Sequence, residues 1–89
     1  MKPNDDEMWR RIVDLEGEEF VQLRGGRFRY VVRGNALVPN RTNRRLPRSS
    51  FAKALAMMPA AGPGQLQHLQ GPSYLFAILM DPRVRGSDW

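Results

Sequence analysis

Cysteine is absent from the 89-residue chain, and histidine occurs once, as His68. Without cysteine there is no disulfide scaffold, no zinc finger and no other metal site built on thiolates, and the chain suits a reducing compartment. A lone histidine also excludes metal sites and nucleases that need two histidines from one chain. We therefore expect neither a metal nor any other cofactor.

Long apolar segments are absent too. The longest uninterrupted one, Tyr74 to Met80, has seven residues, whereas a membrane-spanning helix needs ~20. The first residues, Met-Lys-Pro-Asn-Asp-Asp-Glu, lack the basic-then-apolar pattern of a signal peptide. The sequence thus predicts a cytoplasmic protein without membrane association, in which residues 1–89 form one small domain and residues 83–89 a loose tail.

Negative charge is missing from most of the chain. No carboxylate occurs between Phe20 and Met80, whereas nine basic side chains lie between Arg24 and Lys53. Residues 1–19 carry a balance of −4 and the remainder +9, which together give the net charge of +5. Solvated faces of ordinary domains mix both signs, because a field of one sign repels itself. The basic segment therefore predicts an external polyanion, for which nucleic acid is the default.

The acidic N-terminal segment predicts a helix over residues 5–16. Asn4 is a favourable N-cap, and Glu7 stands three residues later in the capping-box position. Apolar residues then recur at helical spacing until Gly17. Capping and the helix dipole thus account for the acids of the first turn.

Residues 19–39 predict a three-stranded antiparallel meander. Gly25-Gly26 and Gly34-Asn35 each suit a two-residue hairpin turn. The expected pairs are Arg24–Arg27, Leu23–Phe28, Gln22–Arg29 and Val21–Tyr30 in the first hairpin, and Val32–Leu37 and Val31–Val38 in the second. One face of the sheet is then apolar, and the other carries Gln22, Arg24, Arg27, Arg29 and Arg33, with Phe20 and Val31 toward one end.

After Pro39 we expect an arginine-rich loop over residues 39–48 and then a helix over 51–58, capped by Ser49 or Ser50. The apolar run over 74–80 fits either a buried helix that begins at Pro72 or a buried strand. The predicted fold is α+β: an N-terminal helix, the meander, and two short C-terminal helices packed on one sheet face. Its expected core is Trp9, Ile12, Val21, Leu23, Phe28, Tyr30, Val32, Leu37, Phe51, Leu55, Leu75, Ile78 and Leu79.

Enzymatic activity finds little support in the chain, and we expect no catalytic residue. His68 lies in a glutamine-rich segment without a carboxylate nearby in sequence. Ser49 and Ser50 are explained as helix caps, and the Arg24-Gly-Gly-Arg27 segment is too short for a phosphate-binding glycine loop.

The predicted basic face favours nucleic acid. A two- or three-stranded ribbon fits the ~12 Å major groove of B-DNA, where arginine binds phosphates or guanine and glutamine suits adenine. Only Phe20 offers an aromatic ring on that face for base stacking, which favours duplex DNA over RNA. The expected nucleic-acid-binding residues are Gln22, Arg24, Arg27, Arg29 and Arg33 on the sheet, and Arg41, Asn43, Arg44, Arg45, Arg48 and Lys53 beyond it.

The same sequence also fits other interpretations. A one-sided sheet is polar on its outer face whatever its function, and a GC-rich genome also raises arginine content. The alternative is an interaction or regulatory module whose basic face docks on an acidic protein partner. The acidic N-terminal helix could also cover the basic face of a second copy.

Overall fold

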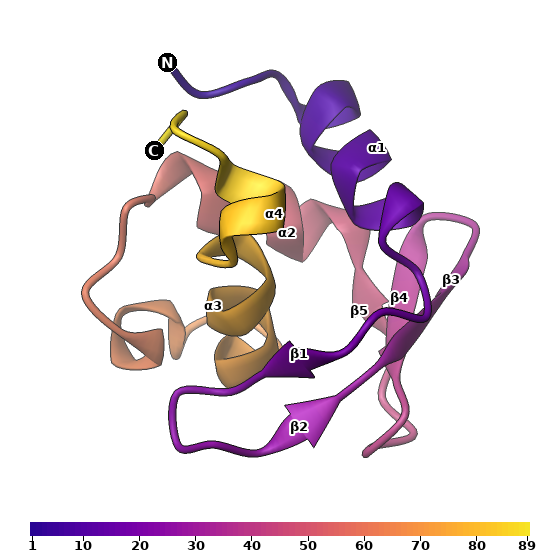
Figure 1. Cartoon of the computed structure of the whole chain (residues 1–89). Coiled ribbons are helices and arrows are strands. Elements are labelled where there is room, and N and C mark those ends of the chain that lie inside the picture. The colour runs from indigo at the N-terminus through magenta and orange to yellow at the C-terminus, as the bar shows by residue number, and fades with distance from the viewer.

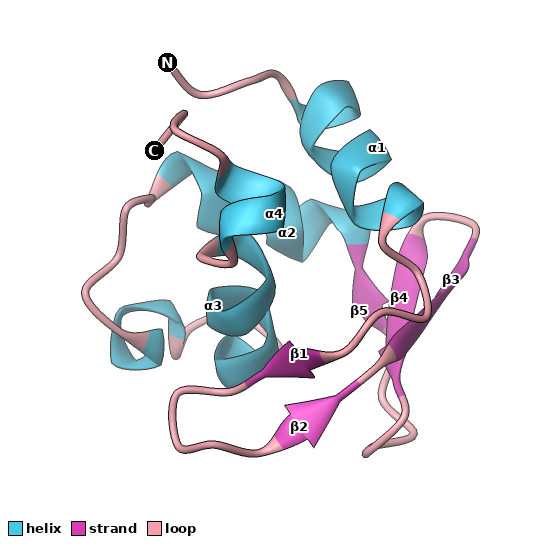
Figure 2. Cartoon of the chain, in the orientation of Figure 1, coloured by secondary structure: helices cyan, strands magenta, loops and turns pink.

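Two small antiparallel sheets adjoin a group of helices that gathers on one side of the larger sheet (Figures 1 and 2). The computed structural model describes residues 1–89 and confirms the α+β class. The elements in chain order are α1 (Asp5–Asp14), β1 (Phe20–Val21), β2 (Arg27–Phe28), β3 (Tyr30–Arg33), β4 (Ala36–Pro39), β5 (Leu46–Pro47), α2 (Arg48–Ala56), the 3-10 helix η1 (Pro63–Leu66), α3 (Pro72–Leu79) and α4 (Pro82–Arg85).

Helix α1 forms as the capping residues predict. The side chain of Asn4 accepts a hydrogen bond of 2.9 Å from the backbone N–H of Glu7. Met8, Trp9 and Ile12 form its buried stripe. The helix ends at Asp14, two residues earlier than expected.

The register of the first hairpin differs from the prediction. Its loop has three residues, Leu23 to Gly25, closed by hydrogen bonds between Gln22 and the two glycines (2.7 and 2.8 Å). Gly25 takes a φ of +91°, the positive value that the last residue of a three-residue hairpin loop requires. Phe20 therefore pairs with Phe28, and Val21 with Arg27.

This three-residue shift turns the first strand over, because an odd shift exchanges the two faces. Phe20, expected on the basic face, is fully buried and stacks against Phe28 with 5.8 Å between ring centroids. Val21 and Leu23, expected in the core, are 53% and 65% exposed. Both core assignments were wrong, because the prediction assumed a two-residue turn at Gly25-Gly26.

The second hairpin is confirmed. Val31 pairs with Val38 and Val32 with Leu37, across the turn at Gly34 and Asn35. The third strand of this sheet is β5, which pairs with β4 and lies inside the expected loop 39–48.

The two sheets meet at Arg29, which lies between β2 and β3. Its backbone exchanges two hydrogen bonds with Asn40, of 2.9 and 2.8 Å, instead of continuing the pairing with β1. The other edge of β3 is covered by the end of α1 and the residues after it. There Gly17 donates to the carbonyl of Tyr30 (3.1 Å), and the Glu16 carboxylate accepts from the N–H of Val32 (2.6 Å). This edge is thereby closed to further strand pairing.

The C-terminal half is helical around one hydrophobic cluster. Helix α2 begins at Arg48, so Ser49 and Ser50 lie within its first turn and do not cap it. The apolar run over 74–80 is the helix α3, with Pro72 at its first position. None of the helices combines the length and the apolar character that a bilayer-spanning segment needs.

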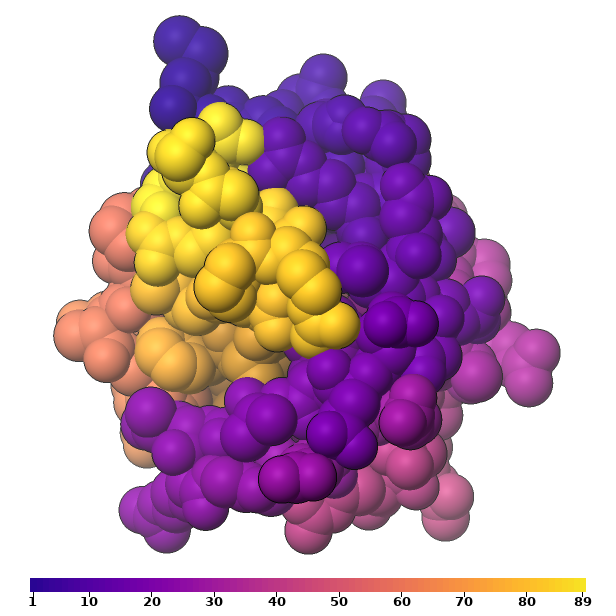
Figure 3. Space-filling model, viewed as in Figure 1, coloured from indigo at the N-terminus to yellow at the C-terminus, as the bar shows by residue number.

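The last residues are packed and do not form the expected loose tail. Val84 of α4 is fully buried, and the indole of buried Trp89 donates a 2.7 Å hydrogen bond to the carbonyl of Leu79. Arg11 of α1 holds Asp88 at 2.7 Å. The space-filling view shows the C-terminal residues against the N-terminal helix (Figure 3). The tail was predicted to be loose because no local pattern reveals these contacts: Asp88 pairs with Arg11 of the first helix, and Trp89 packs against α3.

Truncating Trp89 should therefore destabilise the protein. We expect Trp89→Ala to lower the free energy of unfolding by about 3–5 kcal/mol, the usual cost of removing a large buried side chain. Urea denaturation followed by circular dichroism measures the change. Exposed Ser87→Ala at the same terminus is the control, and an equal stability of the two variants would contradict this packing.

The buried Tyr30 hydroxyl predicts a loss of stability at high pH. It donates to the carbonyl of Ile12, and burial raises the pKa of Tyr30 above its ordinary value. The folded state thus retains the proton that the unfolded chain releases near pH ~10, so the contribution is present below that pH and declines above it.

The measurement is urea denaturation between neutral pH and about pH 11. Tyr30→Phe should be less stable than wild type by about 1 kcal/mol at neutral pH but show a flatter decline above pH ~10. Tyr74→Phe, which removes the other tyrosine hydroxyl, should keep the wild-type decline. Parallel curves for Tyr30→Phe and wild type would count against this assignment.

Candidate nucleic-acid interface

Ion pairs divide the basic side chains into two groups. Eight of the nine carboxylates take part in ion pairs, and the ninth, Glu16, accepts the N–H of Val32. The arginines in these pairs are Arg10, Arg11, Arg27, Arg29, Arg48 and Arg83. The basic residues without a carboxylate partner are Lys2, Arg24, Arg33, Arg41, Arg44, Arg45, Lys53 and Arg85.

Arg48 belongs to the structural group. Its guanidinium binds Asp5 at 2.9 Å and also binds Asp6, and it lies 5.8 Å from the ring centroid of Trp9. These hydrogen bonds raise the pKa of Arg48. The side chain joins the start of α2 to α1, where Trp9 also meets Phe51 edge to face. Arg48 is therefore engaged within the fold and leaves the candidate interface.

Arg27 and Arg29 remain on the outer side of their strand but stand beside an acid. Glu19 lies 3.7 Å from Arg27 and 3.9 Å from Arg29. Arg29 also donates 2.5 Å to the carbonyl of Gly17. Their charge is offset in part, and Arg29 is tied to the covered edge of β3.

Gln22 and Arg24, the polar residues expected on the basic face of the first strand, do not lie there. Gln22 turns toward α3, where its amide donates to the Ser73 hydroxyl at 3.1 Å. Arg24 is exposed in the hairpin loop. The three-residue turn explains the positions of both side chains.

The outer face of the sheet β3-β4-β5 brings together Arg33, Val31 and Val38. No helix lies on this face, and Val31 is 40% exposed. Leu46 is buried, so its neighbour Arg45 points outward by the alternation of side chains. The Arg45 guanidinium, just before β5, reaches past β4 to the carbonyl of Arg33 in β3 at 3.5 Å.

The loop between β4 and β5, which also carries Arg45, adds two further arginines without a carboxylate partner. Arg41 contacts the Gln22 side chain at 3.4 Å, and it passes so close to Gly26 that a Cβ atom there would collide with it. The N–H of Arg44 donates to the Thr42 hydroxyl at 3.2 Å. We call Arg33, Arg41, Arg44 and Arg45 the basic surface. All four are exposed.

A hollow of about 460 Å³ lies beside the basic surface. Its apolar lining includes Val31 and Val38, and its polar lining includes Asn40, Thr42 and Asn43. Sequence reasoning placed both valines on the basic side of the sheet but gave them no role. Of the residues that line the hollow, Arg29 and Asn43 were expected to bind nucleic acid. Their juxtaposition depends on the course of the loop, for which no local signal exists.

Lys53 and Arg24 flank this region without joining it through hydrogen bonds. Lys53 is exposed on α2 beside a second hollow of about 560 Å³, which Asp5 and Asn35 also line. Arg24 lines a third hollow with Gln22 and Ser73. The expected residues therefore divide into a central group and two outlying cations.

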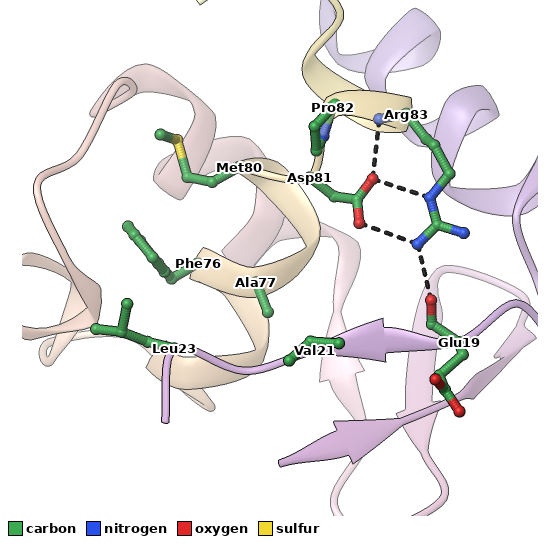
Figure 4. A pocket seen from close by; sticks show the side chains of 9 residues that line it. All are labelled: Glu19, Val21, Leu23, Phe76, Ala77, Met80, Asp81, Pro82 and Arg83. Carbon is green, nitrogen blue, oxygen red and sulfur yellow. Dashed lines mark hydrogen bonds and ion pairs between the residues drawn. The ribbon is translucent and has the colours of Figure 1, made fainter. Parts of the chain in front are cut away.

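A separate apolar hollow of about 300 Å³ lies between β1 and α3 (Figure 4). Val21 and Leu23 form one wall, and Phe76 and Met80 the other. At its end, Arg83 binds both oxygens of Asp81 and the carbonyl of Glu19. Burial of Asp81 opposes ionisation, but the hydrogen bonds from Arg83 outweigh it and lower the pKa of that carboxyl. The polar groups here thus have partners already.

Comparison of the chain with protein-family models, with curated proteins and with solved structures found no match. Its function must therefore be inferred from its own residues and their geometry.

Substitutions in the two groups of arginines should affect stability differently. Arg48→Met should lower the urea midpoint, because it leaves Asp5 and Asp6 without their partner at the α1–α2 contact. Arg44→Met removes the same charge from the basic surface and should leave the midpoint unchanged. Equal midpoints for the two variants would contradict the division.

Proposed function

We propose that this protein binds duplex DNA with the outer face of β3-β4-β5 and the loop that follows β4. The observation that carries the proposal is the clustering of arginines without carboxylate partners on the basic surface. Such a field of one sign is costly for the isolated chain and favourable against phosphates.

The shape of the region supports the same partner. A twisted sheet of three strands presents a convex strip that fits the major groove, which is ~12 Å wide. Arg33 lies beside the turn between β3 and β4, and the Arg45 guanidinium contacts its carbonyl. Arg41 and Arg44 lie in the loop at the other end of β4, which also carries the backbone of Arg45. Arginines at both ends of the strip are well placed for the two phosphate backbones.

Arg24 and Lys53 extend the charge on either side and are proposed as outer phosphate contacts. Arg27 and Arg29 are weaker candidates, because Glu19 lies beside them. The proposal requires no catalytic residue and no cofactor, and it agrees with the expected cytoplasmic location.

Salt dependence tests the proposal. If the four arginines of the basic surface contact phosphates, log affinity should fall with log salt at a slope of about −3.6, from ~0.9 per phosphate. Fluorescence anisotropy with a labelled duplex measures the slope at several salt concentrations. Arg44→Gln should make it shallower by ~0.9.

The matched control is Arg85→Gln on α4, which removes an equally unpaired charge outside the proposed interface. It should leave the slope unchanged. No binding at low ionic strength, or an affinity independent of salt, would refute the proposal.

An acidic protein partner is the alternative, since it would use the same unpaired arginines. Pairing with the acidic helix of a second copy is less favoured, because Asp5, Asp6 and Glu7 already bind arginines of their own chain. Size-exclusion chromatography of the protein alone at low and high salt tests the self-paired form. A self-paired form would dissociate as salt rises, whereas a DNA-binding monomer would elute identically at both.

A further inference from the structure

We infer that the hollow on the outer sheet face recognises A·T base pairs from the major groove. Val31 and Val38 would contact thymine methyl groups, and Asn43 would bind adenine. This inference rests on the proposed DNA binding and adds the sequence preference to it.

The apolar part of the hollow is unusual for a surface rich in charge. Val31 and Val38 are cross-strand partners in the middle of the sheet, so their side chains lie together on the outer face. Arg29 stands two residues before Val31 and Arg33 two residues after it, and Arg29, which is paired with Glu19, also lines the hollow. A phosphate would gain nothing from contact with the valines, whereas the C5 methyl of thymine is the one apolar group in the major groove.

The polar part suits adenine. Asn43 is exposed, and its side-chain amide has no hydrogen-bond partner within the chain, so both its oxygen and its nitrogen are free. An asparagine amide can accept from adenine N6 and donate to N7 at once. Asn40 is less available, because its oxygen already accepts from the N–H of Arg29 at 2.9 Å. Asn43 is therefore the favoured contact and Asn40 the positioning residue for the loop.

The combination of arginines, a free amide and two valines distinguishes DNA from other partners. An acidic protein would satisfy the basic surface but gives no reason for a free amide beside two valines. Duplex RNA has a deep, narrow major groove that side chains do not enter, and its uracil lacks the methyl group. B-form DNA is the partner that uses the arginines, the amide and the valines together.

Replacing thymine by uracil tests the valine contacts atom by atom. Wild type should bind an A·T-rich duplex about fourfold more tightly than the same duplex with uracil in place of thymine, from the burial of about one methyl group. Exchange of the central A·T pairs for G·C should weaken binding about tenfold per pair that is contacted. Anisotropy competition at a fixed salt concentration measures both ratios.

Three variants assign the contacts. Val31→Ser and Val38→Ser should abolish the difference between thymine and uracil, and Asn43→Ala should reduce the preference for A·T over G·C. Val13→Ser is the matched control, because Val13 is 39% exposed on α1, close to the 40% of Val31. It should keep both preferences. Circular dichroism and urea midpoints confirm that each variant is folded.

The possible failures are distinguishable. Salt-dependent binding with equal affinity for thymine, uracil and G·C duplexes overturns this inference and leaves the proposed function intact. A thymine preference that survives in Val31→Ser and Val38→Ser overturns the assignment to the hollow. Stronger binding of duplex RNA than of DNA overturns the recognition of A·T pairs in B-form DNA as a whole. Absence of binding to every duplex refutes the proposed function itself.

Discussion

The pairing of Phe20 with Phe28 determines how the rest of the chain can pack. It places Phe20 beside Phe28 and Tyr30, with ring centroids 5.8 and 5.3 Å away, and Tyr74 of α3 meets Phe28 at 4.9 Å. Arg83 of α4 lies over the Phe20 ring at 4.4 Å, so the C-terminal helix is held to the same cluster. The three-residue turn sets this pairing, because any turn that is one residue shorter or longer would bring Val21 to the aromatic side.

Charge is distributed by the same packing. Most of the acids near the N-terminus serve contacts inside the fold: Asp5 and Asp6 hold Arg48 at the junction of two helices, and Glu16 covers the edge of β3. The acids are thus drawn to the helical side and the covered edge. Since the β4–β5 loop and the outer sheet face have none of their own, the basic surface keeps its full charge. This segregation, more than the number of arginines, favours a polyanionic partner.

Several features could be predicted from local sequence. The cap at Asn4, the second hairpin register and the helix that begins at Pro72 each depend on residues within one turn or one strand pair. Other features could not. The first register required a choice between a two-residue and a three-residue turn, both of which Gly25-Gly26 permits. Arg48 and Trp89 find their partners more than forty residues away or in a different helix, and no periodicity carries that information.

The sequence by itself therefore determined the fold class, the apolar side of most strands and the long interval without acids, because these are properties of neighbouring residues and of composition. The tertiary structure decided which arginines remain free. It also turned the first strand over and brought the asparagines of the β4–β5 loop beside the valine pair on the outer face. The physical reason is that an arginine is neutralised, or left to bind a partner, by groups that are near in space, and folding alone sets those distances.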